Sequence, residues 1–233
     1  MGDLSRLKVC FVAGTLGQGG AERQLFYILR CLRENGAAVR LLSLTSGEYW
    51  ENKIRELGVP VVWVGDKPSR LARLKRIIEE LRQDLPGVVQ SAHFYTNLYA
   101  IVAARRLGLR DVGAIRNDAI SEVRANGRIL GGLSLRLPRL LAPNSRVGLR
   151  NALELGASSS RCHFLPNVVD TDRFRPVMRE HRGFVTLLAV GRLVEQKRLD
   201  RFLRILAKVR SESAVPVRGL IAEIGRASCR ERV

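Results

Sequence analysis

The chain has 233 residues, 46% of them hydrophobic, so it can bury a core and is not disordered. It carries 40 lysines and arginines against 22 acidic residues, a formal net charge of +18. No apolar run approaches the ~20 residues of a membrane-spanning helix, the N-terminus lacks a signal-peptide layout, and the four cysteines show no zinc or disulfide spacing. The composition favours a cytoplasmic protein.

The excess of positive charge leaves two interpretations open. The arginines are either solvated on helix faces or attract an anionic membrane surface or phosphorylated substrates. Aromatic residues make up only 6% of the chain, and no nucleic-acid-binding module is recognisable. We therefore expect no nucleic-acid partner.

Strand-like apolar runs alternate with helical stretches along the first 165 residues. The predicted strands are Lys8–Ala13, Val39–Leu44, Pro60–Val64, Gly87–Gln90, Val112–Ile115, Leu140–Ala142 and Cys162–Leu165. The predicted helices are Ala21–Glu34, Ser69–Gln83, Asn97–Leu107, Gly127–Leu137 and Arg146–Leu155. This alternation predicts an α/β domain with a parallel sheet and helices on both faces.

Two of these helices show a clear apolar stripe at helical spacing. In the first it consists of Leu25, Ile28, Leu29 and Leu32. In the second it consists of Leu71, Leu74, Ile78 and Leu81, and the opposite face is heavily basic.

The first predicted strand is followed by the glycine-rich turn GTLGQGGAERQ, Gly14–Gln24. Such turns often hold phosphates, but this one fits neither common pattern. In the dinucleotide fingerprint Leu16 or Glu22 stands where glycine is needed, and in the P-loop pattern Gly20 and Ala21 replace Lys and Ser/Thr. The turn is therefore predicted at the carboxyl edge of the sheet with a ligand other than these two.

A domain boundary follows residue 165. Residues 166–183 are polar, hold two prolines, show no period and are predicted to be a linker. Residues 184–222 begin a second α/β domain with the strand Phe184–Val190, a helix carrying Leu199 and Phe202, and a strand near Val217. We therefore expect a domain over 1–165 and an incomplete one over 184–222.

Four stretches together carry a family resemblance. They are GGAERQL (Gly19–Leu25), LAPNSR (Leu141–Arg146), PNVVDTDRFRP (Pro166–Pro176) and AVGRLVEQKRLD (Ala189–Asp200). In this order and at these distances they resemble the retaining family-4 nucleotide-sugar glycosyltransferases. The resemblance implies the GT-B architecture, here one complete Rossmann-like parallel-sheet domain followed by the start of a second.

The resemblance assigns the donor diphosphate to two cations. Arg192 ends a strand and Lys197 begins a helix, and in the family this pair grips the diphosphate, whose charge grows as the glycosidic bond breaks. The alternative is that both are ordinary surface cations. Arg198 stands where the family often has glycine.

The first domain holds the remaining candidates. The resemblance places Gly19, Gly20 and Glu22 on the acceptor side of the cleft, the alternative being a merely tight turn. His93 matches a histidine that many members place beside the transferred sugar, and it is our catalytic candidate; the alternative is a structural role. Arg116 and Asn117 are expected to face the same cleft, unless they merely cap a strand end.

The resemblance implies transfer of a sugar, with retention, from a nucleoside diphosphate donor to a polysaccharide or lipid-linked acceptor. It implies neither a metal nor another cofactor. The basic face of residues 69–83 is expected to rest on the inner face of the cell membrane. Two other functions stay open: a GT-B nucleotide-sugar epimerase, and a non-catalytic module that binds a sugar or phosphate.

The end of the chain departs from the family. The family's donor domain continues with a further glycine turn and an acidic stretch, and neither occurs here. Residues 223–233 show no period and a clump of arginines, so we expect a non-native tail on a C-terminally truncated chain that is inactive alone. A native C-terminus is the alternative.

Overall fold

The structure is a computed structural model that describes residues 3–176 and 183–223. The chain divides into two compact units, Met1–Val169 and Asp170–Val233, called unit 1 and unit 2. The stretches 177–182 of the predicted linker and 224–233 of the predicted tail lie outside the described residues.

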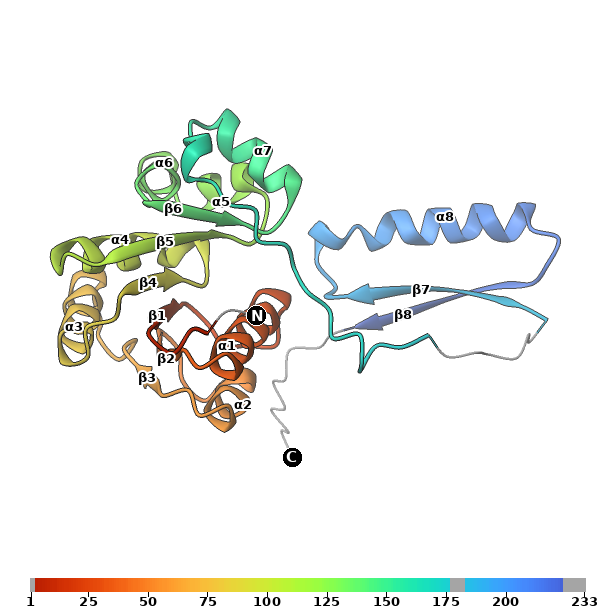
Figure 1. The fold of residues 1–233 in the computed structure, drawn as a ribbon. Helices are drawn as coiled ribbons and strands as arrows, with labels where there is room; N and C mark the ends of the chain where they lie inside the picture. The colour runs from red at the N-terminus through yellow and green to blue at the C-terminus, as the bar shows by residue number, and fades with distance from the viewer. Residues whose placement is uncertain (1–2, 177–182, 224–233) are drawn as a thin grey trace. The chain divides into compact units, whose positions relative to one another are not determined.

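Unit 1 is built on a six-stranded sheet in which all neighbours are parallel (Figure 1). The strands are β1 Lys8–Ala13, β2 Ala38–Ser43, β3 Val61–Trp63, β4 Val88–Ser91, β5 Arg110–Ile115 and β6 Leu140–Pro143. Their order is β3-β2-β1-β4-β5-β6. The chain therefore adds strands on one side of β1 up to β3 and then on the other side from β4 onward, so the strand order reverses between β1 and β4. The predicted α/β fold with a parallel, Rossmann-like sheet is confirmed.

Unit 1 has seven α-helices within the described residues; six lie between these strands and α7 follows the last one. They are α1 Gly20–Glu34, α2 Tyr49–Glu56, α3 Arg70–Gln83, α4 Asn97–Arg106, α5 Ala119–Ala125, α6 Arg128–Arg136 and α7 Arg146–Glu154. Two short 3-10 turns are η1 Phe94–Thr96 and η2 Ser159–Arg161. All five predicted helices are present, whereas α2 and α5 are not in the prediction because they have only 8 and 7 residues and no long stripe.

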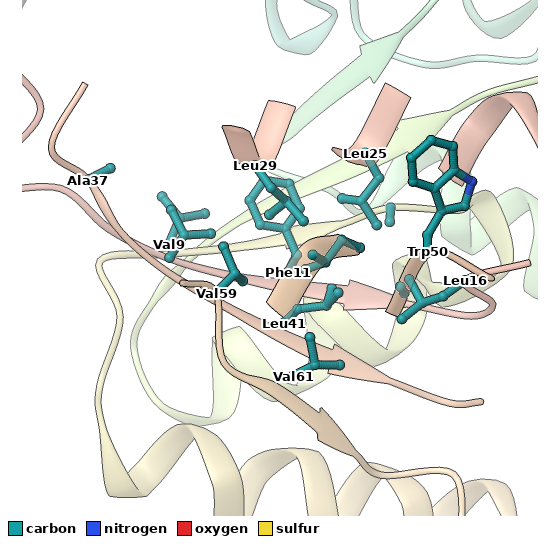
Figure 2. Close-up of a cluster of buried hydrophobic side chains, with 14 residues drawn as sticks. Val9, Phe11, Leu16, Leu25, Leu29, Ala37, Leu41, Trp50, Val59 and Val61 are labelled. Atoms are coloured by element: carbon teal, nitrogen blue, oxygen red, sulfur yellow. The ribbon is translucent and has the colours of Figure 1, made fainter. Parts of the chain in front are cut away.

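The sheet is buried on both faces, which explains the unbroken apolar sequence of β1. Phe11 points toward α1 and α2, where it packs with Leu25, Leu29 and Trp50 (Figure 2). On the other face Val12 packs in a cluster that α3 and α4 complete. The helices therefore fix the sheet from both sides and leave its carboxyl edge to the loops.

The predicted stripe of α3 is wrong at its first residue. Leu81 is buried and Leu74 and Ile78 are partly buried against the core, but Leu71 is 78% exposed. The fully buried Ile77 lies outside the predicted stripe. The core cluster on this face begins one turn into the helix, so Leu71 in the first turn stays outside it.

The predicted strand Cys162–Leu165 is also wrong. Its residues form a single isolated bridge with Leu141 of β6. His163 and Leu165 donate their N–H groups to carbonyls of β6 at 2.8 and 2.9 Å. In the part of the chain that the structure describes, no further strand of this sheet lies beyond the segment, and it stays an extended edge segment rather than a full strand.

Unit 2 contains β7 Val185–Gly191, the 3-10 turn η3 Glu195–Lys197, α8 Leu199–Glu212 and β8 Val217–Glu223. β7 and β8 pair in parallel, with α8 as the crossover. Many large apolar side chains of these elements are exposed, among them Leu188, Val190, Leu203, Ile205 and Leu220. Across both units, none of the helices in the described ranges has the length and hydropathy to cross a membrane.

Candidate functional site

The candidate site of unit 1 lies at the carboxyl edge of its sheet, where the strand order reverses. The glycine loop, defined as residues 14–19, follows β1, and His93 follows β4, the strand next to β1. Ligands of open parallel sheets bind beyond the carboxyl ends of the strands at such a reversal point. The sequence therefore brings two of its candidates to the expected place.

His93 contacts the first residue of the glycine loop and the helix that follows the loop. Its Nδ1 accepts the backbone N–H of Gly14 at 3.1 Å, and its Nε2 lies 3.2 Å from Oε1 of Glu22 in the first turn of α1. The side chains of His93 and Glu22 are only 8% and 10% exposed. Because an N–H group can only donate, Nδ1 carries no proton, and the proton of the neutral ring is on Nε2, facing the carboxylate.

Two glycines leave space for this arrangement. A Cβ on Gly14 would lie 2.0 Å from the Tyr95 hydroxyl oxygen, and a Cβ on Gly19 would lie 2.1 Å from Oε2 of Glu22. A Cβ on Gly20 would meet no atom within 4 Å. A side chain at 14 or 19 would therefore displace the Tyr95 ring or the Glu22 carboxylate, whereas packing does not explain the glycine at 20.

Glu48, which the sequence does not single out, anchors the first half of the loop. Its carboxylate accepts hydrogen bonds from the hydroxyl groups of Thr15 and Thr45, at 2.9 and 2.5 Å, and from the backbone N–H of Leu16. Glu48 directly precedes the unpredicted helix α2, so no sequence pattern marks it. Glu48 thus holds the loop directly, whereas Glu22, in the helix that follows the loop, is bonded to His93.

Tyr95 is a second residue that the sequence does not single out. Its ring stacks on His93 with centroids 5.4 Å apart. Burial, together with the negative charges of Glu22, Glu48 and Glu122, raises the pKa of Tyr95 to about 12. The hydroxyl therefore stays protonated at neutral pH and remains a hydrogen-bond donor at this edge.

The two candidates after β5 differ from each other. Asn117 donates to Oε1 of Glu122 at 3.0 Å, and burial raises the pKa of Glu122. Arg116 is partly buried, which lowers its pKa, and its guanidinium has no hydrogen bond or ion pair with another described residue. No hydrogen bond joins either residue to His93 within the described chain, but the charge of Glu122, the partner of Asn117, interacts with His93.

The two donor-side candidates belong to unit 2 and are described within it. Arg192 directly follows β7, Lys197 ends η3, and both side chains are exposed. The side-chain stem of Lys197 passes Gly191, where an added Cβ would lie 3.4 Å from Cγ of Lys197. Neither cation has an ion pair with another described residue. Arg198, the residue that replaces a common glycine, has a left-handed backbone with φ of +49°.

Two shallow hollows of about 240 and 250 Å³ lie elsewhere on unit 1. One lies between α3 and α4, lined by residues such as Leu71 and Arg106, and the other lies at the amino edge of the sheet beside Lys8 and Arg33. Neither is lined by the glycine loop or His93.

Comparisons with known proteins concern the family and the fold of the chain. The profile of the family described as Glycosyltransferase Family 4 matches residues 18–173. A phosphatidylinositol N-acetylglucosaminyltransferase component of Arabidopsis thaliana is 22% identical over 214 residues, covering 82% of this chain and 46% of that protein. The chain thus spans about half the length of this curated relative.

Several solved structures share the fold. Anabaena Alr3699/HepE in complex with UDP-glucose has a TM-score of 0.68 at 14% identity, covering 93% of this chain and 69% of that chain. The apo form of the lipopolysaccharide outer core galactosyltransferase WaaB has a TM-score of 0.66 at 13% identity, covering 92% of this chain and 60% of that chain. The UDP-GlcNAc 2-epimerase of Methanocaldococcus jannaschii has a TM-score of 0.55 at 14% identity, covering 91% of this chain and 65% of that chain. At these identities the likeness concerns the fold alone.

Proposed function

The chain belongs to glycosyltransferase family 4, and on that premise we propose that it binds a nucleoside diphosphate sugar and transfers the sugar to a glycan or lipid-linked acceptor. The observation that carries the proposal is the family match over residues 18–173, which includes the glycine loop from Gln18 onward, Glu22 and His93. The similar Alr3699/HepE was solved with UDP-glucose, which supports a nucleotide-sugar donor.

The donor diphosphate is proposed to bind Arg192 and Lys197. When the glycosidic bond breaks, negative charge accumulates on the leaving diphosphate, and fixed cations stabilise it. A guanidinium fork matches phosphate oxygens in a bidentate manner, and an ammonium adds a point charge. Both side chains are exposed and without an ion pair among the described residues, so they are available to an anion.

Unit 1 is proposed to bind the acceptor and the sugar. Arg116 is a partly desolvated cation without a partner among the described residues, and a phosphate or carboxylate of the ligand would offset its burial. The loop supplies backbone N–H groups at the start of α1, because Gly19 has no side chain to cap them. Tyr95 adds a neutral hydroxyl donor beside the loop.

The proposed reaction retains the anomeric configuration. The bond between the anomeric carbon and the diphosphate oxygen breaks while the acceptor oxygen attaches on the same face. The acceptor proton passes to the leaving diphosphate. This route needs no pair of enzymic carboxylates, unlike glycoside hydrolysis, and we propose that it also needs no metal.

A transfer assay separates this function from its two alternatives. The natural gene product that contains this chain is incubated with radiolabelled uridine, guanosine and adenosine diphosphate sugars, a lipid extract as acceptor source, and a chelator. We expect label on an acceptor with retained configuration. An epimerised nucleotide sugar would instead favour the epimerase, a class with a solved structure of similar fold, and tight binding without turnover would favour a binding module.

We also propose that unit 1 contacts an anionic membrane through the first turn of α3. Arg70 is exposed there beside the 78% exposed Leu71, and Lys75 is exposed in the next turn, a combination of charge and apolar surface that suits a lipid interface. Co-sedimentation with vesicles should rise with anionic lipid content, fall with salt and weaken in Arg70→Glu/Leu71→Ser. Lys208→Glu, an exposed position in unit 2, is the control for charge alone. A sedimented fraction of protein that does not change with the anionic lipid content would refute the proposal.

A further inference from the structure

Both ring nitrogens of His93 are already bonded inside unit 1. Nδ1 accepts the N–H of Gly14 at 3.1 Å, and Nε2–H faces the Glu22 carboxylate at 3.2 Å. The imidazole therefore has neither a free lone pair nor a free proton for a sugar hydroxyl. A ring in this state cannot act as an acid, a base or a polar ligand of the sugar without breaking one of these bonds.

The two bonds join segments that are far apart in the sequence. Gly14 and Glu22 are 79 and 71 residues from His93; Gly14 begins the glycine loop, and Glu22 lies in the first turn of α1, just after the loop. His93 itself is fixed at the end of β4, because its carbonyl accepts the hydroxyl group of Ser91 at 2.6 Å and its N–H donates to Thr96 at 3.3 Å. The imidazole thus connects the start of the loop and the helix that follows the loop to a strand of the sheet.

The side chain of Glu22 is committed to the same connection. Its carboxylate is 10% exposed and faces His93, and Gly19 lacks the Cβ that would displace it. The other ionisable groups that interact with this cluster are Tyr95, which stacks on the imidazole, and Glu122 from α5. Of these, only Glu22 is hydrogen-bonded to the imidazole among the described residues.

We propose that His93 and Glu22 are positioning residues of the transfer reaction, which hold the glycine loop in its ligand-binding geometry rather than exchanging a proton or touching the sugar through their polar atoms. The inference rests on the proposed function for its effect on transfer. The connection itself is a property of the free protein and can be tested without any ligand.

The direct test is hydrogen exchange of the Gly14 amide, measured by NMR in the full 233-residue chain. His93→Ala removes the acceptor, so exchange at Gly14 should accelerate about tenfold or more. The amide oxygen introduced by His93→Asn lies where Nδ1 lies and should hold exchange within about threefold of wild type. Equal exchange in wild type, His93→Ala and His93→Asn would overturn the proposal.

Glu22 is tested through the imidazole proton. The chain has three histidines, so the Hε2 resonance of His93 can be assigned with few variants. It should be visible in wild type and in Glu22→Gln, which keeps an oxygen acceptor, and lost to solvent exchange in Glu22→Leu. Gly19→Ala should weaken it by displacing the carboxylate, whereas Gly20→Ala, which adds a Cβ in open space, should not. A resonance unaffected by Glu22→Leu would contradict the role of Glu22.

The transfer assay then separates positioning from proton transfer. We expect His93→Asn and Glu22→Gln to keep most of the transfer rate and His93→Ala and Glu22→Leu to lose about a hundredfold, since misplacing a loop by an ångström has that effect. Equal, large losses in His93→Asn and His93→Ala, with normal Gly14 exchange in the former, would assign His93 a chemical role and overturn the proposal. Absence of transfer by wild type would refute the proposed function and leave the exchange data to decide on the connection.

Discussion

Asn97 shows how much of unit 1 depends on single buried polar residues. Its side-chain amide donates to the carbonyls of Ala114 in β5 and Ser134 in α6, at 3.2 and 3.1 Å, and its oxygen accepts the N–H of Ala114 at 2.9 Å. Asn97 is itself the first residue of α4 and is fully buried. One side chain therefore connects a strand and two helices.

Asn97→Ala should lower the free energy of unfolding by about 3 kcal/mol, because it leaves a buried N–H and two carbonyls without partners. Urea-induced unfolding measures this change. The matched control is Asn35→Ala at the end of α1, where only the partly exposed hydrogen bonds to the carbonyl and the weak acceptor Sγ of Cys31 are lost, with an expected loss within about 0.5 kcal/mol. Equal losses in the two variants would contradict the account of Asn97.

At the residue scale the sequence predicts the glycine loop, Glu22 and His93 from local motifs and their resemblance to a family. It does not predict Glu48 or Tyr95. Both act through contacts with residues distant in the sequence, such as the bond between Glu48 and Thr15, 33 residues apart. Such pairs leave no periodic pattern, and only the fold brings them together.

At the element scale the strands and long helices follow from their apolar periodicity. β1 has the predicted bounds, Lys8–Ala13, because a strand buried on both faces is one unbroken apolar run. The wrong predictions concern Leu71 and the segment Cys162–Leu165, which lie where the core or the sheet ends. The periodicity of a segment predicts which residues could be buried, but not where its packing neighbours stop.

Arg198, which stands where the family often has glycine, has an unusual backbone conformation. Its φ of +49° and ψ of +43° are left-handed, a conformation that costs a residue with a Cβ about 1–2 kcal/mol and costs glycine little. This explains in physical terms why glycine suits the position. The side chain compensates in part through hydrogen bonds to Asp200 at 3.0 and 2.9 Å, which lower the pKa of that exposed carboxyl.

Arg198→Gly should therefore slow amide exchange in α8, with a gain in local stability of up to about 1 kcal/mol. Lys208→Gly in the middle of the same helix is the control, and it should cost about 1 kcal/mol because helix interiors disfavour glycine. Destabilisation by both variants would show that the hydrogen bonds to Asp200 outweigh the backbone strain.

At the scale of the whole molecule the two units differ in how well they bury their apolar residues. Unit 1 has continuous clusters on both faces of its sheet. In the described part of unit 2, only Gly191 and Val217 are buried, and α8 has no buried residue. The sequence predicts the strand–helix alternation of both units. The alternation alone does not predict what fraction of the apolar side chains is buried in each unit.

The link between the units begins on unit 1. Gln24 of α1 donates to the carbonyl of Val168 and accepts its N–H, both at 2.8 Å, so the start of the predicted linker is bound to the first domain. The compact division falls between Val169 and Asp170, four residues after the predicted end of that domain. A side-chain contact over 144 residues explains this difference, and no local composition signals it.

The proposed donor site requires that a nucleoside diphosphate sugar binds through Arg192 and Lys197. The most direct measurement is a titration of the ¹⁵N-labelled chain with uridine, guanosine and adenosine diphosphate sugars, followed through its amide resonances. We predict that one of them shifts the amides of Arg192 and Lys197, that Lys208 in the same unit does not shift, and that Arg192→Ala and Lys197→Ala each weaken binding about tenfold or more. Binding that shifts other residues and is unchanged in both variants, or no binding by any of the sugars, would contradict the claim.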